Sequence, residues 1–183
     1  MTGSNQNNLI LFGYQSCGKS YFGKLLSREL HCPFIETDVI IEQFYREKYL
    51  EPLSCRQIAN KLGEGGFRLL EMQAVDSIRE VSNSVISVGG GTLINQENYS
   101  KVKKRGKLIF LDVEKQIIKQ RIFKDGVPSY LNQHDPENSF EQMYDQRLPI
   151  YAKLAMFTVT LQDKSVRQVL DELTSIYTER DSK

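Results

Sequence analysis

Short apolar runs alternate with longer stretches of mixed polarity along the chain. Apolar runs of a few residues that are bounded by turn-forming residues are typical of strands buried inside a sheet. The clearest runs are Leu9–Phe12, Ser84–Val88 and Lys107–Leu111, and weaker ones are Pro33–Ile35 and Phe157–Leu161. We predict a strand at each of these places.

The stretches between the runs carry apolar residues at steps of three or four, which is the period of an amphipathic helix. This spacing is found in Tyr21–Leu30, Phe67–Val81, Glu114–Phe123 and Ser165–Tyr177. Strands that alternate with helices favour a parallel sheet with helices on both faces. The predicted fold class is therefore α/β.

The composition agrees with one compact domain. The chain has 183 residues, of which 40% are hydrophobic and 26% are charged, and domains usually hold about 100–200 residues. We expect residues 1–183 to form a single domain. The net charge of +1 disfavours broad electrostatic binding to nucleic acid or to an anionic membrane.

Three widely spaced cysteines, Cys17, Cys32 and Cys55, cannot all pair within the chain, and they are typical of reduced cytosolic thiols. The first residues, MTGSNQNN, are polar and uncharged and do not form a leader pattern. No apolar run is long enough to span a bilayer. We expect a cytoplasmic protein with no membrane or nucleic-acid partner.

One motif bears directly on the chemistry. Residues 13–20, GYQSCGKS, match G-x-x-x-x-G-K-[ST] between a predicted strand and a predicted helix, which is the context of a phosphate-binding P-loop. Its backbone N–H groups surround the phosphates of a nucleotide. Lys19 would bridge the β- and γ-phosphates, and Ser20 would ligate Mg²⁺. The residues expected to bind the nucleotide are Gly13, Ser16, Cys17, Gly18, Lys19, Ser20 and Tyr21.

A P-loop alone does not distinguish kinases from GTPases or ATPases. The segment NKLG at 60–63 lacks the aspartate of a guanine-reading NKxD motif, and D-x-x-G occurs nowhere. Asp112 ends an apolar run, as the metal-binding acid of a general ATPase would. A chain of 183 residues has no room for a large mechanical domain, so a small-molecule kinase is favoured.

Two acids near a predicted strand end are candidates for the acceptor side. Glu36 and Asp38 are two residues apart and share one face of an extended chain, and ligands bind at the strand ends of open parallel sheets. Asp38 could accept a hydrogen bond from a substrate hydroxyl, and Glu36 could lie toward Mg²⁺. The alternative is that Asp38 only caps a helix that starts near Val39.

Arginines and glycines provide further candidates. Arg68 and Glu71 are three residues apart, so Glu71 can orient the guanidinium toward an anion, although the pair would also suit a solvated surface. The triplet Gly89–Gly91 follows a predicted strand and indicates close approach of the backbone to a ligand. Arg147 lies in a helical stretch, where a solvated arginine is the alternative. The segment Asp125–Asn138 is rich in Gly, Pro, Asn and Asp, which is typical of a functional lid or a disordered loop.

In this order the elements closely resemble the shikimate kinase family of P-loop kinases. The matching segments are the P-loop, FIETDVIIE at 34–42, GEGGFRLLE at 63–71, the glycine triplet and RLPIY at 147–151. The resemblance implies a five-stranded parallel sheet of order 2-3-1-4-5, a mobile lid at about 124–138 and shikimate-binding helices at about 38–80. It also implies Mg²⁺-dependent transfer of a phosphoryl group from ATP to the 3-hydroxyl of shikimate, in chorismate and aromatic amino-acid biosynthesis.

The resemblance also implies roles for residues on the acceptor side. By position, Arg68 and Arg147 resemble the pair that grips the shikimate carboxylate. Asp38 and the backbone at Gly90, within the triplet Gly89–Gly91, resemble the groups that read its hydroxyls. Asp38 would also orient the attacking hydroxyl or take its proton.

On the nucleotide side the chain both matches the family and departs from it. Arg121 resembles the basic residue that begins the lid near the adenine, residues 162–166 resemble the other adenine wall, and Asp112 resembles a helix cap. The family's lid carries an arginine just before Pro-Leu-Leu, but Val127 stands there. We expect Lys124 to supply that cation, or Arg121 to serve alone.

The metal site also departs from the family, since Glu36 stands where an aspartate is common. We expect Ser20 and Glu36 to hold Mg²⁺, and ATP and shikimate to be the partners of a monomeric enzyme. The alternatives are a kinase for gluconate or a nucleoside monophosphate, and a degenerate nucleotide-binding regulatory domain. Lys19, Ser20 and Asp38 are all retained, which argues against degeneracy.

Overall fold

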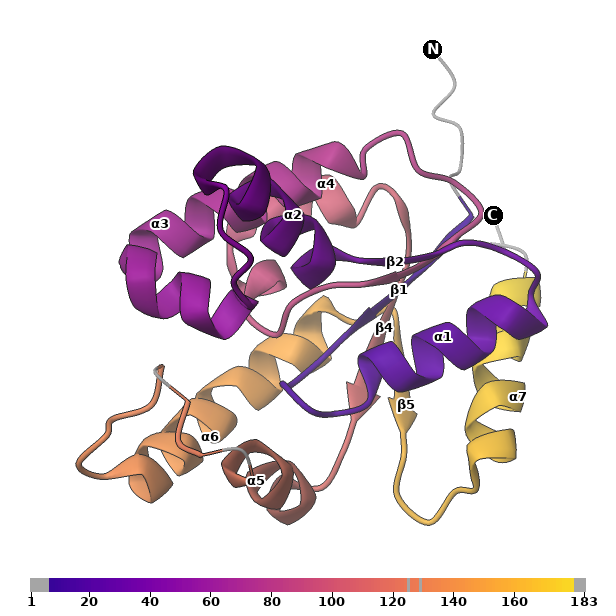
Figure 1. Cartoon of the computed structure of the whole chain (residues 1–183). Helices are drawn as coiled ribbons and strands as arrows, with labels where there is room; N and C mark the ends of the chain where they lie inside the picture. The colour runs from indigo at the N-terminus through magenta and orange to yellow at the C-terminus, as the bar shows by residue number, and fades with distance from the viewer. Residues whose placement is uncertain (1–6, 125, 129, 180–183) are drawn as a thin grey trace.

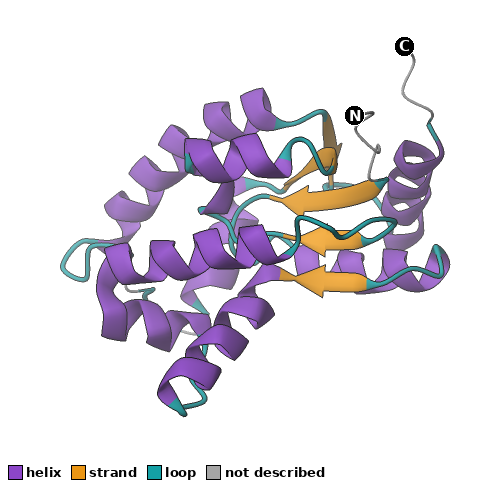
Figure 2. Ribbon diagram, turned by 90° about the horizontal axis from the view of Figure 1, so that it is seen from above, coloured by secondary structure: helices purple, strands orange, loops and turns teal. Residues whose placement is uncertain are grey.

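The structure is a computed structural model that describes residues 7–124, 126–128 and 130–179. Within this part of the chain, five parallel strands form one sheet in the order β2-β3-β1-β4-β5, and Figure 2 shows them running in the same direction. The strands are β1 (Asn8–Phe12), β2 (Phe34–Glu36), β3 (Val85–Ser87), β4 (Gly106–Asp112) and β5 (Phe157–Thr160). The predicted fold class and strand order are confirmed.

Strand β1 lies at the middle of the sheet and is buried at every position. It pairs with β3 on one side and β4 on the other, so that Ile10 lies beside Ile86 and Leu108. Because helices cover both faces of such a sheet, a central strand is apolar on both faces and reads as a continuous hydrophobic run. This explains why the run Leu9–Phe12 is so distinct in the sequence.

Helices surround the sheet on both sides. Helices α1 and α7 contact each other on one side, and α3, α4 and α6 lie on the other (Figure 1). The helices are α1 (Lys19–Glu29), α2 (Thr37–Tyr49), α3 (Cys55–Ser77), α4 (Gln96–Val102), α5 (Lys115–Phe123), α6 (Pro136–Leu154) and α7 (Val166–Thr178), and the 3₁₀ turn η1 is Thr92–Ile94. Among the described residues, none of these helices combines the length and apolar character needed to cross a bilayer.

Helix α3 differs most from the prediction. The apolar spacing predicts a helix over Phe67–Val81, whereas α3 starts at Cys55 and has a break at Gly63, whose φ is 68° and ψ is 178°. Such a positive φ favours glycine. A capping box formed by Ser54 and Gln57 starts the helix, because each side chain accepts a hydrogen bond from the backbone N–H of the other. Residues 55–62 are thus a helical segment that apolar spacing alone does not reveal.

The predicted loop Asp125–Asn138 is shorter in the structure. Helix α6 begins at Pro136, and the side chain of Asp135 caps it by accepting from the backbone N of Asn138. Proline is favoured in the first turn because its missing N–H has no partner there in any case. Of this loop, Asp125 and Ser129 lie outside the described residues.

The buried side chain of Asn8 joins three segments at the amino edge of the sheet. Its Nδ2 donates to the carbonyls of Val81 and Arg105 at 2.8 and 2.7 Å, and its Oδ1 accepts from the backbone N of Ser84 at 3.0 Å. A buried polar group left without a partner costs about 1–3 kcal/mol. These three bonds therefore hold the start of β1 in register.

Gly106 is packed closely against Asn8 at this edge. A β-carbon on Gly106 would lie 2.1 Å from the carbonyl oxygen of Asn8. Since the backbone of a central strand cannot move away, we expect Gly106→Ala to lower the free energy of unfolding by about 1–3 kcal/mol. Gly65→Ala is the matched control, because no atom outside its own helical turn lies within 4 Å of its β-carbon and alanine is favoured in helices. Urea denaturation measures both, and equal stability of the two variants would contradict the packing argument.

Candidate active site

A cleft with a volume of about 1270 Å³ opens at the carboxyl edge of the sheet, which is where open parallel sheets bind ligands. The P-loop, the start of α2, helix α3, the glycine triplet after β3 and helix α6 all contribute to its walls. In Figure 1, α3 and α6 both lie near the end of β1 where the P-loop begins. The charged residues that line the cleft are Lys19, Glu36, Asp38, Arg56, Glu64, Arg68, Glu71 and Arg147.

The P-loop is a tight turn between β1 and α1. Three of its residues have positive φ angles, 143° at Gly13, 63° at Ser16 and 106° at Gly18, and glycine adopts such angles at no steric cost. Helix α1 begins at Lys19, so its unpaired N–H groups are directed at the loop. The Lys19 ammonium donates to the carbonyls of Gly13 and Tyr14 at 3.2 and 2.8 Å. This arrangement concentrates positive charge where phosphates would lie.

Ser20 in the first turn of α1 meets Glu36 at the end of β2. The Ser20 hydroxyl donates to Oε1 of Glu36, and both residues line the cleft beside Lys19. A hydroxyl and a carboxylate are oxygen ligands of the kind that Mg²⁺ prefers, together with water and phosphate oxygens. The two residues therefore fit a Mg²⁺ ion that is shared with a nucleotide.

Asp38 is the second residue of α2 and lines the cleft. Helix α2 begins at Thr37, with Glu36 at the N-cap and no side-chain capping bond, so the alternative that Asp38 caps the helix is wrong. Burial raises the pKa of the Asp38 carboxyl, and the charge of Lys19 acts in the opposite direction. A carboxylate with a raised pKa close to the lysine of the P-loop is suited to accept a proton.

The glycine triplet lets three parts of the site approach one another. A β-carbon on Gly89 would lie 3.1 Å from Oδ1 of Asp38, and one on Gly91 would lie 2.7 Å from Nη1 of Arg68. A β-carbon on Gly90 would lie 3.2 Å from the carbonyl oxygen of Gly13 in the P-loop. Each glycine thus leaves space for a different wall, which is the reason for three in succession.

Glu71 holds the guanidinium of Arg68 at the cleft wall. Glu71 is 3% exposed, and its carboxylate accepts from Nη1 of Arg68 and from the Thr92 hydroxyl at 2.8 Å. A buried carboxylate requires such donors. The pair does not lie on a solvated surface, and Arg68 is presented to the cleft in a defined orientation.

Arg147 lies on α6 between two tyrosines that attach this helix to the rest of the site. The Tyr151 hydroxyl donates to the carbonyl of Gly90, and the Tyr14 hydroxyl donates to the carbonyl of Tyr144 at 2.6 Å. The rings of Tyr14 and Tyr144 also stack, with centroids 4.3 Å apart. Burial raises the pKa of Tyr151 to about 12, so its hydroxyl stays protonated. Helix α6 is thereby fixed to both the P-loop and the glycine triplet.

Several residues at the outer side of the cleft belong to none of the motifs found in the sequence. The Tyr130 hydroxyl donates to Oε1 of Gln15 at 2.9 Å, and Nη2 of Arg56 donates to the carbonyl of Val127 at 2.5 Å. Arg56 belongs to the first segment of α3, so the Ser54-x-x-Gln57 capping box is the signal that could have placed it on a helix. No comparable signal exists for Tyr130 in a loop.

On the nucleotide side, two predicted regions lie beside the P-loop. Nη1 of Arg121 donates to the carbonyl of Ser16 at 3.1 Å. A β-carbon on Gly18 would lie 3.7 Å from Cδ2 of Leu161, the residue that precedes the loop at 162–166. Tyr21, which follows the motif, lines the cleft and is 55% exposed.

Other predicted residues do not line the cleft. Gly13 and Cys17 are the buried residues of the P-loop among these, and Lys124 is exposed at the end of α5. Asp112 ends β4, whereas Glu114 is the N-cap of α5. The expectation that Asp112 caps a helix is therefore wrong.

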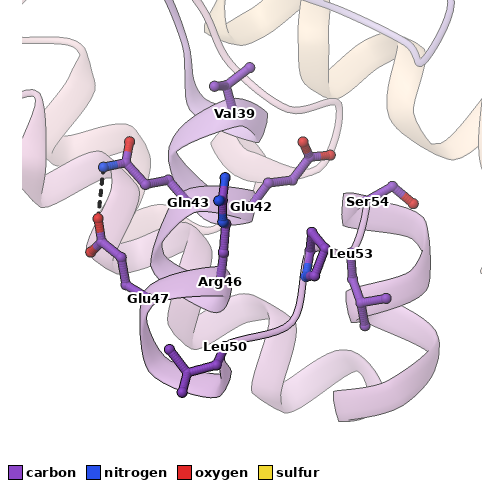
Figure 3. A pocket seen from close by; sticks show the side chains of 9 residues that line it. Val39, Glu42, Gln43, Arg46, Glu47, Leu50, Leu53 and Ser54 are labelled. Atoms are coloured by element: carbon purple, nitrogen blue, oxygen red, sulfur yellow. Dashed lines mark hydrogen bonds between the residues drawn. The ribbon is translucent and has the colours of Figure 1, made fainter.

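A second hollow, with a volume of about 930 Å³, lies between α2 and the segment 50–54. Figure 3 shows Gln43 hydrogen-bonded to Glu47 along this face of α2, with Arg46 and Leu50 nearby. It shares no lining residue with the cleft. We therefore assign it no part in the candidate site.

Known proteins resemble this chain in sequence and in fold. The family model for shikimate kinase matches residues 15–178. The shikimate kinase of Caldanaerobacter subterraneus is 32% identical to this chain over 170 residues, which are 93% of this chain and 95% of the relative.

Solved structures agree with this match. The shikimate kinase from Aquifex aeolicus is 32% identical, with a TM-score of 0.75 over 92% of this chain and 94% of that one. The shikimate kinase from Acinetobacter baumannii, solved in complex with shikimate, has a TM-score of 0.82 at 24% identity over 96% of this chain and 95% of that one. Because the family match spans most of the sequence and relatives share about a third of its residues over nearly their whole length, the chain belongs to the shikimate kinase family.

Proposed function

We propose that this chain transfers the γ-phosphoryl group of ATP to the 3-hydroxyl of shikimate. The observation that carries the proposal is the meeting of two kinds of site in one cleft. The P-loop with Lys19 suits a nucleotide, and Arg68, Arg147 and Asp38 line the same cleft. Planar guanidinium groups suit a carboxylate, and Asp38 suits a hydroxyl, so together they match a hydroxy acid.

On the donor side, Lys19 and the backbone N–H groups of the P-loop bind the phosphates. Tyr21 and Arg121 flank the nucleotide. The P-loop residues that contribute backbone are Gly13, Ser16, Cys17 and Gly18. Ser20 and Glu36 would hold Mg²⁺, which when bound offsets charge on the β- and γ-phosphates. The bond from the Ser20 hydroxyl to Glu36 supports this assignment, because it brings two oxygen ligands together.

On the acceptor side, α2 and α3 form one wall and α6 forms the other. Arg68 and Arg147 bind the carboxylate, and the backbone at Gly89, Gly90 and Gly91 approaches the ring closely because no side chain intervenes. The acceptor oxygen then forms a bond to the γ-phosphorus while the bond to the β–γ bridging oxygen breaks. The hydroxyl proton passes to Asp38, and ADP and the phosphate ester are the products.

We further propose that the chain acts as a single-domain cytoplasmic monomer. All residues assigned to both substrates come from one chain, so no second copy is needed to complete the site. Three free cysteines are consistent with a reducing compartment.

The first prediction concerns the substrate. We expect ADP release that depends on both Mg²⁺ and shikimate, because the cleft combines a P-loop with two carboxylate-binding arginines. A coupled assay with shikimate, gluconate or a nucleoside monophosphate as the acceptor measures this. Stimulation by gluconate or the nucleotide, with none by shikimate, would contradict the proposed function.

The second prediction separates the two sides of the site. Lys19 faces charge that moves in the transition state, so we expect Lys19→Ala to lower kcat by about 10²–10³-fold. Arg147 holds a carboxylate that does not react, so Arg147→Ala should weaken shikimate binding by about 10–100-fold and spare ATP binding. Steady-state kinetics measures kcat, and calorimetry with each ligand measures binding. Lost ATP binding with normal shikimate binding in Arg147→Ala would refute the assignment.

The third prediction concerns Asp38 as the proton acceptor. We expect Asp38→Asn to lower kcat by about 10²–10⁴-fold with little change in melting temperature, since the amide has the same size. The base must be ionised, so in the wild type the rate should fall as the pH drops through the raised pKa of Asp38. This acid limb should disappear in Asp38→Asn, and a near-normal rate in the variant would exclude the role.

A further inference from the structure

Arg56 is a positively charged residue of the cleft to which the proposed function assigns no role. It lies in the first segment of α3, residues 55–62, one residue after Cys55 and four before Asn60, and all three line the cleft. Arg56 and Asn60, four residues apart, lie one above the other on the same face of the helix. This face is therefore turned toward the space between the P-loop and the acceptor wall.

The Arg56 guanidinium reaches across to the segment that covers the outer side of the cleft. Its Nη2 donates to the carbonyl of Val127 at 2.5 Å and lies 3.9 Å from the position of a β-carbon on Gly126. Val127 and Pro128, which also line the cleft, are apolar. The positively charged guanidinium of Arg56, on α3, thus contacts the segment 126–128 across the cleft.

Arg56 also acts on a group that touches the P-loop. Desolvation raises the pKa of the Tyr130 hydroxyl to about 12, and the charges of Arg147 and Arg56 act against this rise. The same hydroxyl donates to Gln15 of the P-loop. Arg56 and Arg147 therefore both lie near a hydroxyl that contacts the P-loop.

We propose that Arg56 is a catalytic residue that contacts the phosphoryl group in transit, in the place of the lid arginine that Val127 replaces. The inference rests on the proposed function, since it presumes phosphoryl transfer in this cleft. Charge on the equatorial oxygens must be offset during transfer, and a guanidinium offers several donors in a fixed plane. Lys124 is exposed at the end of α5 and does not line the cleft, so Arg56 is better situated for this task.

Substitutions at Arg56 test the charge separately from the hydrogen bond. We expect Arg56→Ala to lower kcat at least about tenfold while the KM for ATP changes by less than about twofold. Arg56→Lys keeps the charge and should recover part of the loss. Arg56→Gln can still donate to Val127 but is neutral, so it should resemble Arg56→Ala. Lys61→Gln removes a charge from the same segment at a residue that pairs with Glu51, and it should leave kcat unchanged.

A double-mutant cycle gives a more stringent test. If Arg56 supplies the cation that Val127 does not, then Val127→Arg in the Arg56→Ala background should restore most of the lost kcat, and the two changes should be strongly non-additive. A purely structural role for Arg56 would give additive effects. The melting temperature of each variant identifies loss of folding.

Three results would overturn the inference. They are a kcat within about twofold of wild type in Arg56→Ala, a wild-type rate in Arg56→Gln, and additive effects in the cycle. A large loss in Lys124→Met with none in Arg56→Ala would assign the cation to Lys124 instead. Absence of shikimate-dependent turnover in the wild type would instead refute the proposed function, so the two failures are distinguishable.

Discussion

The turn that follows β1 is the constraint on which the rest of the site depends. A β-carbon on Gly13 would lie 2.9 Å from the carbonyl of Leu111 in β4 and 3.1 Å from Sγ of Cys17, so the chain must turn there without a side chain. Because β1 is buried between β3 and β4, it cannot shift to relieve a larger residue. The position of the P-loop is therefore determined by the packing of the central strands.

The glycine triplet places the acceptor side relative to the P-loop. It follows β3, the neighbour of β1, and its three residues approach the P-loop, Asp38 and Arg68. Parallel pairing aligns the ends of β1, β2 and β3 at one edge, so elements that are far apart in sequence meet there. The donor and acceptor sides are consequently built on one edge of the sheet.

The sequence was most informative where local physics and tertiary structure agree. The buried strands and the P-loop could be predicted because continuous apolar runs and a glycine-rich turn of this spacing are compatible with few alternative structures. The first segment of α3 could not, because Ile58 is its buried apolar residue and only a capping box reveals its start. The partners of Arg56, Tyr130 and Tyr151 were also out of reach, since each bond joins residues more than 60 positions apart.

The break at Gly63 divides α3 into two parts with different dependence on the core. The second part carries Arg68 and contributes the buried residues Leu70, Glu71, Ala74 and Val75. The first part, residues 55–62, contributes Ile58 to the buried core while presenting Arg56, Ala59 and Asn60 to the cleft. During evolution, substitutions at its cleft-lining residues Ala59 and Asn60 can change the wall of the cleft and leave the buried Ile58 in place. Substitutions at Arg68 or Glu71 change recognition and folding together, so new specificities should arise preferentially on the near side of the glycine.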